Sequence, residues 1–177
     1  MGEDKAFLKY GSLFLYQYNL KILEHFTDNL LVSSANKAFN HSYYLRVEDE
    51  IPNLGPIGGI YSSLKKIDYK NAIVLPCDLP FITIDIIDEL IEKSKGYEIC
   101  IAKNSTGQVE PLVGVYSTSL LPMMEELIKK GKYKLQDLLS SSNTNFVTFE
   151  NSPQNTFRNV NHPDDFRALP PLPNTGG

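Results

Sequence analysis

The sequence predicts an α/β protein, a three-layer α/β/α sandwich built around a Rossmann-like, mostly parallel sheet. Strand and helix signals alternate along the chain, which is typical of βαβ units. The segment 71–75 is an apolar run bounded by turn residues, as expected of a strand buried on both faces inside a parallel sheet. The length of 177 residues favours one domain. We therefore expect a single domain over residues 1–167 and a flexible tail or cloning scar over residues 168–177.

Hydrophobic spacing and turn residues predict the elements of the first half. Leu15, Tyr18, Ile22 and Phe26 recur at helical spacing, whereas short apolar runs between turn residues indicate strands. The predicted elements are a helix over 13–27, strands over 30–34 and 43–47, a helix over 56–66 and a strand over 71–75.

The second half continues the alternation. Thr83 is expected to cap a helix whose apolar face runs to Ser94, and Gly96 would end it. The remaining predicted elements are strands over 99–103 and 112–116, helices over 119–130 and 135–139, a strand over 146–149 and a helix from Pro163.

Asp78 is the candidate functional residue that the residues alone point to. It follows the strand over 71–75 and stands between Pro76 and Pro80. In open α/β sheets, ligands bind just beyond the carboxyl ends of the strands. A carboxylate there can hold a hard cation such as Mg²⁺ against a substrate phosphate. The alternative is that Asp78 only caps the next helix or sits in a turn.

Composition argues against several classes of function. The net charge of −4 disfavours a broad nucleic-acid surface. Cys77 and Cys100 are too far apart for a CxxC pair, and the three histidines lack zinc-site spacing. No apolar run reaches the ~18 residues of a membrane span. We expect a cytoplasmic protein that binds neither nucleic acid nor membrane.

Five short segments, taken together in order, resemble the molybdenum cofactor guanylyltransferases of the MobA type. They are 1–5 (MGEDK), 55–59 (GPIGG), 76–81 (PCDLPF), 110–116 (EPLVGVY) and 159–166 (NVNHPDDF). The resemblance covers about residues 1–166 and implies the fold of the nucleotide-diphospho-sugar transferases. It also implies transfer of GMP from MgGTP to the terminal phosphate of molybdopterin, with release of pyrophosphate. Other cofactor-biosynthesis proteins and molybdoenzymes would be the partners.

The resemblance assigns phosphate and metal roles to three residues. Lys5 would meet the nucleotide phosphates, although a solvated lysine is the alternative reading. Asp78 would be the Mg²⁺ ligand. Asn161 would lie near the metal and the acceptor phosphate, and it could equally cap the helix that begins at Pro163.

The resemblance also suggests residues that contact the nucleotide. Asp49 matches a nucleotide-contacting carboxylate, although by itself it reads as a solvated acid. Ser34 occupies a nucleotide-contacting position, which Asn36 could fill instead. Gly55, with Gly58 and Gly59, would let the backbone approach the nucleotide or would simply ease a turn into a helix. Candidates for the anionic pterin are Lys103, Lys132 and Arg158.

The chain departs from the family pattern at its start. The family opens with a buried strand and a glycine-rich loop, and this sequence begins at the Met1-Gly2 of that pattern. We expect the natural protein to carry roughly ten to twenty further residues, enough for a strand and a loop. Without them the chain should bind GTP poorly. The neighbours of a central strand would then have unpaired backbone groups.

Three alternatives compete with the guanylyltransferase reading. The first is another nucleotidyltransferase that uses a sugar phosphate or CTP. The second is a degenerate relative that binds but does not catalyse. The third is a receiver-type domain in which Asp78 accepts a phosphoryl group, although the expected neighbouring acidic pair is not visible in the sequence.

Overall fold

The computed structural model describes residues 4–41, 43–153, 155–161 and 165. Its first elements are η1 (Lys5–Phe7), β1 (Lys9–Tyr10), β2 (Leu13–Phe14), α1 (Leu15–Leu23), β3 (Leu31–Ser33), η2 (Lys37–His41), β4 (Leu45–Val47), α2 (Pro56–Leu64) and β5 (Asn71–Val74). They are followed by α3 (Ile84–Lys93), β6 (Ile99–Lys103), β7 (Val109–Ser117), η3 (Thr118–Leu120), α4 (Leu121–Lys129), α5 (Leu135–Ser141) and β8 (Thr144–Thr148).

The strands of the described residues form one larger sheet and two small ones. The larger sheet has the order β5-β7-β6-β8, whereas β1 pairs with β2 and β3 pairs with β4. Since β5 and β6 are both antiparallel to β7, and β8 is parallel to β6, three of the four strands run in one direction. The small β3–β4 sheet is also parallel. The predicted α/β fold with a mostly parallel sheet is confirmed, with β7 as the reversed strand.

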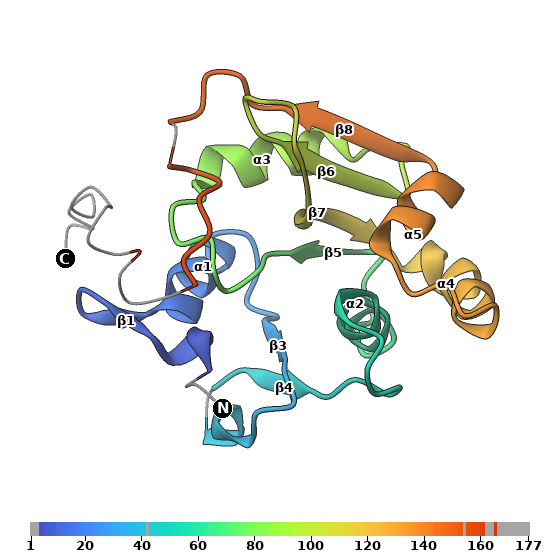
Figure 1. Cartoon of the computed structure of the whole chain (residues 1–177), viewed down its shortest axis with the longest axis horizontal. Coiled ribbons are helices and arrows are strands. Elements are labelled where there is room, and N and C mark those ends of the chain that lie inside the picture. The colour runs from blue at the N-terminus through green and yellow to red at the C-terminus, as the bar shows by residue number, and fades with distance from the viewer. Residues whose placement is uncertain (1–3, 42, 154, 162–164, 166–177) are drawn as a thin grey trace.

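Two hydrophobic cores lie on opposite faces of the larger sheet. Each core is covered by helices, so the sheet is the middle of three layers. Ile99 and Ile101 of β6 pack with α2, α4 and α5, whereas Cys100 and Ala102 pack with α3. This alternation follows from the two-residue side-chain period of a strand. All four residues are fully buried. Figure 1 shows α3 on one side of the strands and α2, α4 and α5 on the other.

Several element boundaries differ from the predicted ones. The helix predicted over 13–27 is shorter, because residues 13–14 pair with β1 as a small hairpin. The helix predicted over 119–130 begins only at Leu121, after η3, with Pro122 in its first turn, where a missing N–H costs nothing. Thr83 is the N-cap of α3 as predicted, but its side chain makes no capping hydrogen bond. The helix predicted from Pro163 lies outside the described residues.

The prediction for the strand over 71–75 is wrong in one respect. This strand, β5, is an edge strand of the larger sheet rather than a central one. Asn71 is exposed, and Ala72 to Val74 are only partly buried. The apolar composition was read correctly as a strand, but the sequence pattern does not show which strands neighbour it.

Helices of the described part of the chain are all too short or too polar to cross a membrane.

Candidate functional site

Three predicted site residues meet beyond the carboxyl end of β5. Lys5 Nζ donates hydrogen bonds to Asp78 Oδ2 at 2.5 Å and to Asn161 Oδ1 at 3.2 Å. The three residues come from the start, the middle and the end of the described chain. The positively charged Lys5 side chain thus lies beyond the carboxyl end of a strand, between two side-chain oxygen atoms. This is the place in an open α/β sheet where a site for anionic substrates is expected.

Backbone contacts fix the positions of these side chains. The turn before Asp78 is held by Asn19, whose Nδ2 donates to the carbonyl of Pro76 at 2.5 Å. The backbone N–H of Val160 donates to the carbonyl of Asp78 at 2.9 Å, which docks the C-terminal segment beside the turn. The N–H of Asn161 is bound by Asp165 Oδ2 at 2.8 Å. The Asn161 side chain faces Lys5.

Burial and charge keep the neighbouring groups in single protonation states. Burial lowers the pKa of Lys5, but the hydrogen bond and charge of Asp78 outweigh it, so the pKa of Lys5 is raised. Burial, followed by the charge of Asp78, raises the pKa of Cys77 to about 11. A neutral thiol is a poor nucleophile. Cys77 is therefore not a candidate for covalent catalysis.

Glu110 is a second carboxylate that the sequence reasoning did not single out. Burial raises its pKa first, and the charge of Asp78 raises it further, which indicates that the two carboxylates face a common region. Asn104 Nδ2 lies 3.5 Å from Glu110 Oε1. Glu110 belongs to β7, which pairs with β5, the strand that leads to Asp78.

The oxygen atoms of this cluster suit a hard cation. Among the described residues there is no group of three or more His, Cys, Asp or Glu side chains that could hold a metal alone. Mg²⁺, however, is usually bound by one or two carboxylates together with substrate phosphates and water. Asp78 and Asn161 offer oxygen ligands of that kind, so the residues present fit a metal that arrives with a nucleotide.

The predicted nucleotide residues line a cavity of about 770 Å³ between β3, α2 and β5. Ser34, Asp49 and Gly55 all lie on its wall. Gly55 precedes α2 with a φ of 66°, a conformation that glycine adopts without strain. Asp49 follows β4, and Ser34 follows β3, so both side chains stand beyond the ends of parallel strands.

Gly58 and Gly59 allow α2 to approach these polar side chains closely. A Cβ at Gly59 would lie 2.7 Å from Ser33 Oγ, and a Cβ at Gly58 would lie 3.2 Å from Asp49 Oδ2. Ser33 in turn lies within 3.5 Å of Asp49 Oδ1. The structure therefore gives these two glycines a packing role, and their contact with a nucleotide stays a prediction.

Asp4 and Asn36 connect the two groups of residues. Asp4 caps η1 by accepting a hydrogen bond from the N–H of Ala6 at 3.1 Å, which sets the direction of Lys5. Asn36 Nδ2 donates to Asp4 Oδ2 at 2.9 Å, and its backbone N–H donates to Ser34 Oγ at 3.0 Å. Sequence reasoning missed Asp4 and considered Asn36 only as a substitute for Ser34 or as the end of a strand. Contacts across 32 residues leave no local signal.

Three basic residues were suggested for the anionic pterin, and the structure gives the surroundings of each. Lys103 Nζ lies 4.5 Å from the centre of the Phe146 ring, a cation–π contact. Lys132 follows the end of α4, where its N–H bonds to the carbonyl of Leu127. Arg158 lies in the docked C-terminal segment. Their role stays a prediction.

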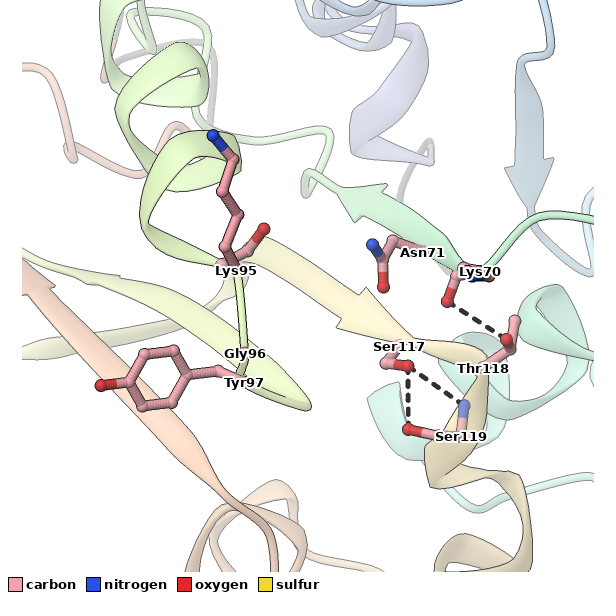
Figure 2. Close-up of a pocket in the computed structure, with 9 residues that line it drawn as sticks. Lys70, Asn71, Lys95, Gly96, Tyr97, Ser117, Thr118 and Ser119 are labelled. Carbon is pink, nitrogen blue, oxygen red and sulfur yellow. Dashed lines mark hydrogen bonds between the residues drawn. The ribbon is translucent and has the colours of Figure 1, made fainter.

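A second hollow, of about 500 Å³, lies at the opposite end of β5 and is lined by Lys70, Lys95, Tyr97 and Ser117 among others. Figure 2 shows that its hydroxyl groups bond locally: Ser117 Oγ with Ser119, and Thr118 Oγ1 with the carbonyl of Lys70. Because β5 runs from Asn71 to Val74, this hollow is separated from Asp78 by the length of the strand. Its lining contains no carboxylate and no unpaired buried group, so we assign it no function.

The geometry agrees with comparisons to known proteins. The family model of the MobA-like NTP transferase domain matches residues 1–145. A protein of Methanothermobacter thermautotrophicus, named "Probable molybdenum cofactor guanylyltransferase", is 34% identical over 179 residues, covering 94% of this chain and 91% of that protein.

Two solved structures share the fold. One is molybdopterin-guanine dinucleotide biosynthesis protein A of Archaeoglobus fulgidus, with a TM-score of 0.78 and 21% identity, covering 94% of this chain and 89% of that one. The other is Rv0371c of Mycobacterium tuberculosis in complex with manganese, with a TM-score of 0.69 and 16% identity, covering 94% and 91%. The chain belongs to the family of MobA-like NTP transferases and is a nucleotidyltransferase of that type.

Proposed function

We propose that the protein transfers GMP from GTP to the terminal phosphate of molybdopterin, with Mg²⁺ bound at the site, and releases pyrophosphate. The names of the relatives support this choice of substrates. The observation that carries the proposal is the meeting of Lys5, Asp78 and Asn161 beyond β5. A structural neighbour solved with manganese supports a divalent metal.

This reaction needs no side-chain nucleophile. A phosphate monoester has its second pKa near ~6, so the attacking oxygen of molybdopterin is already ionised at pH 7. That oxygen forms a bond to the α-phosphorus of GTP, and the bond from this phosphorus to the oxygen of pyrophosphate breaks. The protein has only to bring two anions together and to stabilise the charge that develops. A site with a neutral Cys77 and a charged Lys5 suits that task.

Each residue of the site has a proposed task. Asp78 and Asn161 would hold Mg²⁺, which supplies neutralising charge to the phosphates when it is bound. Lys5 leaves Asp78 and pairs with phosphate oxygens of the nucleotide. Ser34 and Asp49, on the wall of the cavity, contact the nucleoside end. The backbone at Gly55 approaches the same ligand.

The proposal is tested by measuring pyrophosphate release with GTP, Mg²⁺ and molybdopterin. Asp78→Asn should lower turnover by about 10²- to 10³-fold, the typical cost of losing one electrostatic stabiliser. Asp68→Asn is the control, because Asp68 is exposed and precedes β5 at the end away from Asp78. Equal turnover in wild type and Asp78→Asn would refute the proposed role.

The same assay separates the rival functions. Faster release with CTP, or with a sugar phosphate in place of molybdopterin, would indicate a related transferase instead. A protein that only binds would release no pyrophosphate with any pair of substrates. Its affinity for Mg²⁺ and GTP, measured by calorimetry, would also be unchanged in Asp78→Asn.

A further inference from the structure

One border of the larger sheet is formed by β8, which pairs with β6 on one side and with no described strand on the other. Figure 1 shows β8 at the upper border of the sheet, with β6 below it. The strand runs over five residues, Thr144–Thr148. Phe146, at its centre, is a large apolar side chain that is 38% exposed. Two strands, β7 and β6, separate this border from β5.

Every second residue of β8 directs its backbone groups away from β6. The N–H of Phe149, just after the strand, donates to the carbonyl of Lys103 at 3.0 Å. Backbone groups of successive residues in a strand point to opposite sides, so the odd-numbered residues of β8 bond to β6. The N–H and C=O groups of the even-numbered residues therefore point outward. These residues are Thr144, Phe146 and Thr148.

This edge lacks the features that keep an exposed strand from pairing. Native proteins protect sheet edges with charged side chains, prolines or bulges. The sequence of β8 is Thr-Asn-Phe-Val-Thr, without a charged residue or a proline. Its register with β6 continues without a shift from Thr144 to Thr148, so no bulge turns the strand away. By contrast, β4 at the border of the small sheet is only three residues long and contains Arg46.

The outward groups of β8 are complementary to those of a second copy that runs in the opposite direction. When Phe146 lies opposite Phe146 of the second copy, Thr144 lies opposite Thr148 in both directions. All three pairs then consist of outward-facing residues, as the hydrogen-bonded pairs of an antiparallel ladder require. The arrangement has a two-fold axis, which is the commonest symmetry of homodimers. The two phenylalanine rings lie on one face, where aromatic pairs stabilise a sheet.

The charge of the edge also suits a second copy. A two-fold interface brings the same surface of both copies together, so a charged edge would meet its own charge. The chain has a net charge of −4, but none of this charge lies on β8. Lys103 of β6 lies 4.5 Å from the centre of the Phe146 ring and thus covers part of that ring from within the same sheet. The neutral strand can therefore approach its own copy without repulsion between like charges across the ladder.

We infer that the edge of β8 is an interaction surface for a second copy of the chain, paired antiparallel about Phe146. The contact joins the two larger sheets of the pair into one continuous sheet. A strand of this length spans only ~17 Å, so the contact is smaller than a stable interface of standard size. We expect a dimer that forms with a Kd on the order of 10–100 μM. This inference does not depend on the proposed reaction.

The first experiment measures self-association of the 177-residue protein by sedimentation equilibrium. The mean mass should rise from the monomer value of 19.9 kDa toward twice that value as the concentration rises from about 5 to 200 μM. Phe146→Lys should weaken association by at least about tenfold, because two like charges would lie directly opposite each other. The control is Leu45→Lys, which places the same charge at an apolar residue of β4 that is 58% exposed. A monomer at every concentration, or an equal effect of both variants, would overturn the inference.

A mixture of two variants then locates the two-fold axis. Phe146→Lys and Phe146→Glu should each remain monomeric over the same range, because each new charge meets its own copy. An equimolar mixture should associate at least about tenfold more tightly than either variant alone, since lysine then faces glutamate. Unfolded variants would not recover association on mixing, so the recovery separates a lost contact from a lost fold. A mixture that associates no more tightly than its components would contradict the inference.

Amide hydrogen exchange identifies the paired backbone groups without a variant. The N–H groups of Thr144, Phe146 and Thr148 should exchange at least about threefold more slowly at the higher protein concentration than at the lower. The N–H of Val147, which bonds to β6 in both states, should change less. Slowing confined to other strands would assign the association to another surface and would refute the role of β8.

Discussion

At the scale of single residues, the ion pair of Lys5 and Asp78 is suited to being broken. The Lys5 side chain is 42% exposed and that of Asp78 is 14% exposed. Pairs with such access to water stabilise a fold by only about 0–1 kcal/mol. The pair therefore costs little to separate when a metal and a triphosphate compete for its members. It holds both side chains in the site until then.

The first prediction concerns Lys5→Met. Unfolding in urea should show a loss of at most about 1 kcal/mol, because the pair is partly exposed. Pyrophosphate release should fall by at least about 10²-fold, since a positive charge at the phosphates is lost. The control is Lys65→Met, which breaks a pair with Glu50 at 2.7 Å in which each side chain is 37% exposed. That variant should lose comparable stability and retain turnover. A large loss of stability in Lys5→Met alone would give Lys5 a structural role instead.

The second prediction concerns pH. The pKa of Lys5 is raised in the folded protein above its ordinary value of 10.5. The stability that this shift contributes is fully present below about pH 10.5 and is lost only as pH rises through the higher folded value. Turnover should therefore show no inflection from Lys5 between pH 7 and 9. The acid limb should follow the acceptor phosphate near ~6. An inflection between pH 7 and 9 that vanishes in Lys5→Arg would contradict this account.

Some of the residues of the site were predicted from the sequence. Lys5, Asp78 and Asn161 were placed by motifs, and the structure brings them together. Asp4 and Glu110 were not singled out, because their value arises from partners far away in the chain. A single sequence contains no signal for such pairs. The catalytic roles of all these residues stay predictions.

At the scale of elements, close backbone approach limits what the strands can accept. In β7, a Cβ at Gly114 would lie 2.4 Å from the carbonyl oxygen of Cys100 and 2.5 Å from Ile101 Cγ2. Both neighbours belong to β6, whose residues Ile99 to Ala102 are fully buried. No side-chain rotation can relieve a clash with a backbone oxygen, so the two strands would have to separate locally.

The third prediction compares Gly114→Ala with Gly59→Ala by urea unfolding. Gly114→Ala should destabilise the protein by about 1–3 kcal/mol or more, as overpacking in a tight core does. Gly59→Ala meets only Ser33 Oγ, the end of a side chain, at 2.7 Å. Rotation of Ser33 can relieve that contact, and alanine favours the helix by about 1 kcal/mol. Its stability should therefore stay within about 1 kcal/mol of wild type. A greater loss in Gly59→Ala than in Gly114→Ala would contradict the geometry.

Sequence patterns predicted the long elements well and the short ones poorly. The strand over 99–103 has the predicted bounds, since its apolar run is continuous and lies between turn residues. The hairpin of β1 and β2 was missed, because strands of two residues have no detectable period. Strand order is a tertiary property. For that reason the apolar run of β5 was taken for a central strand and proved to be an edge.

At the scale of the whole molecule, the sheets differ in how deeply their strands are buried and in how many strand partners they have. β6 lies between β7 and β8, is covered by a core on each face, and contributes Ile99 to Ala102 at 0% exposure. The β3–β4 sheet has only two strands of three residues, and in the described sheets no strand pairing joins it to β5. Local stability follows such differences in burial and hydrogen bonding.

The fourth prediction is that native-state hydrogen exchange separates these parts. The amides of β6 should exchange most slowly, through global unfolding, because both of its edges are paired. The amides that join β3 to β4, such as that of Ser34, should exchange at least about tenfold faster through opening of the small sheet alone. Moderate urea should accelerate exchange in β6 far more than in β3, because global unfolding exposes more surface than local opening. Equal rates and equal urea dependence in the two strands would show instead that the two sheets open together. In that case the molecule would unfold as one cooperative unit despite the missing backbone pairing.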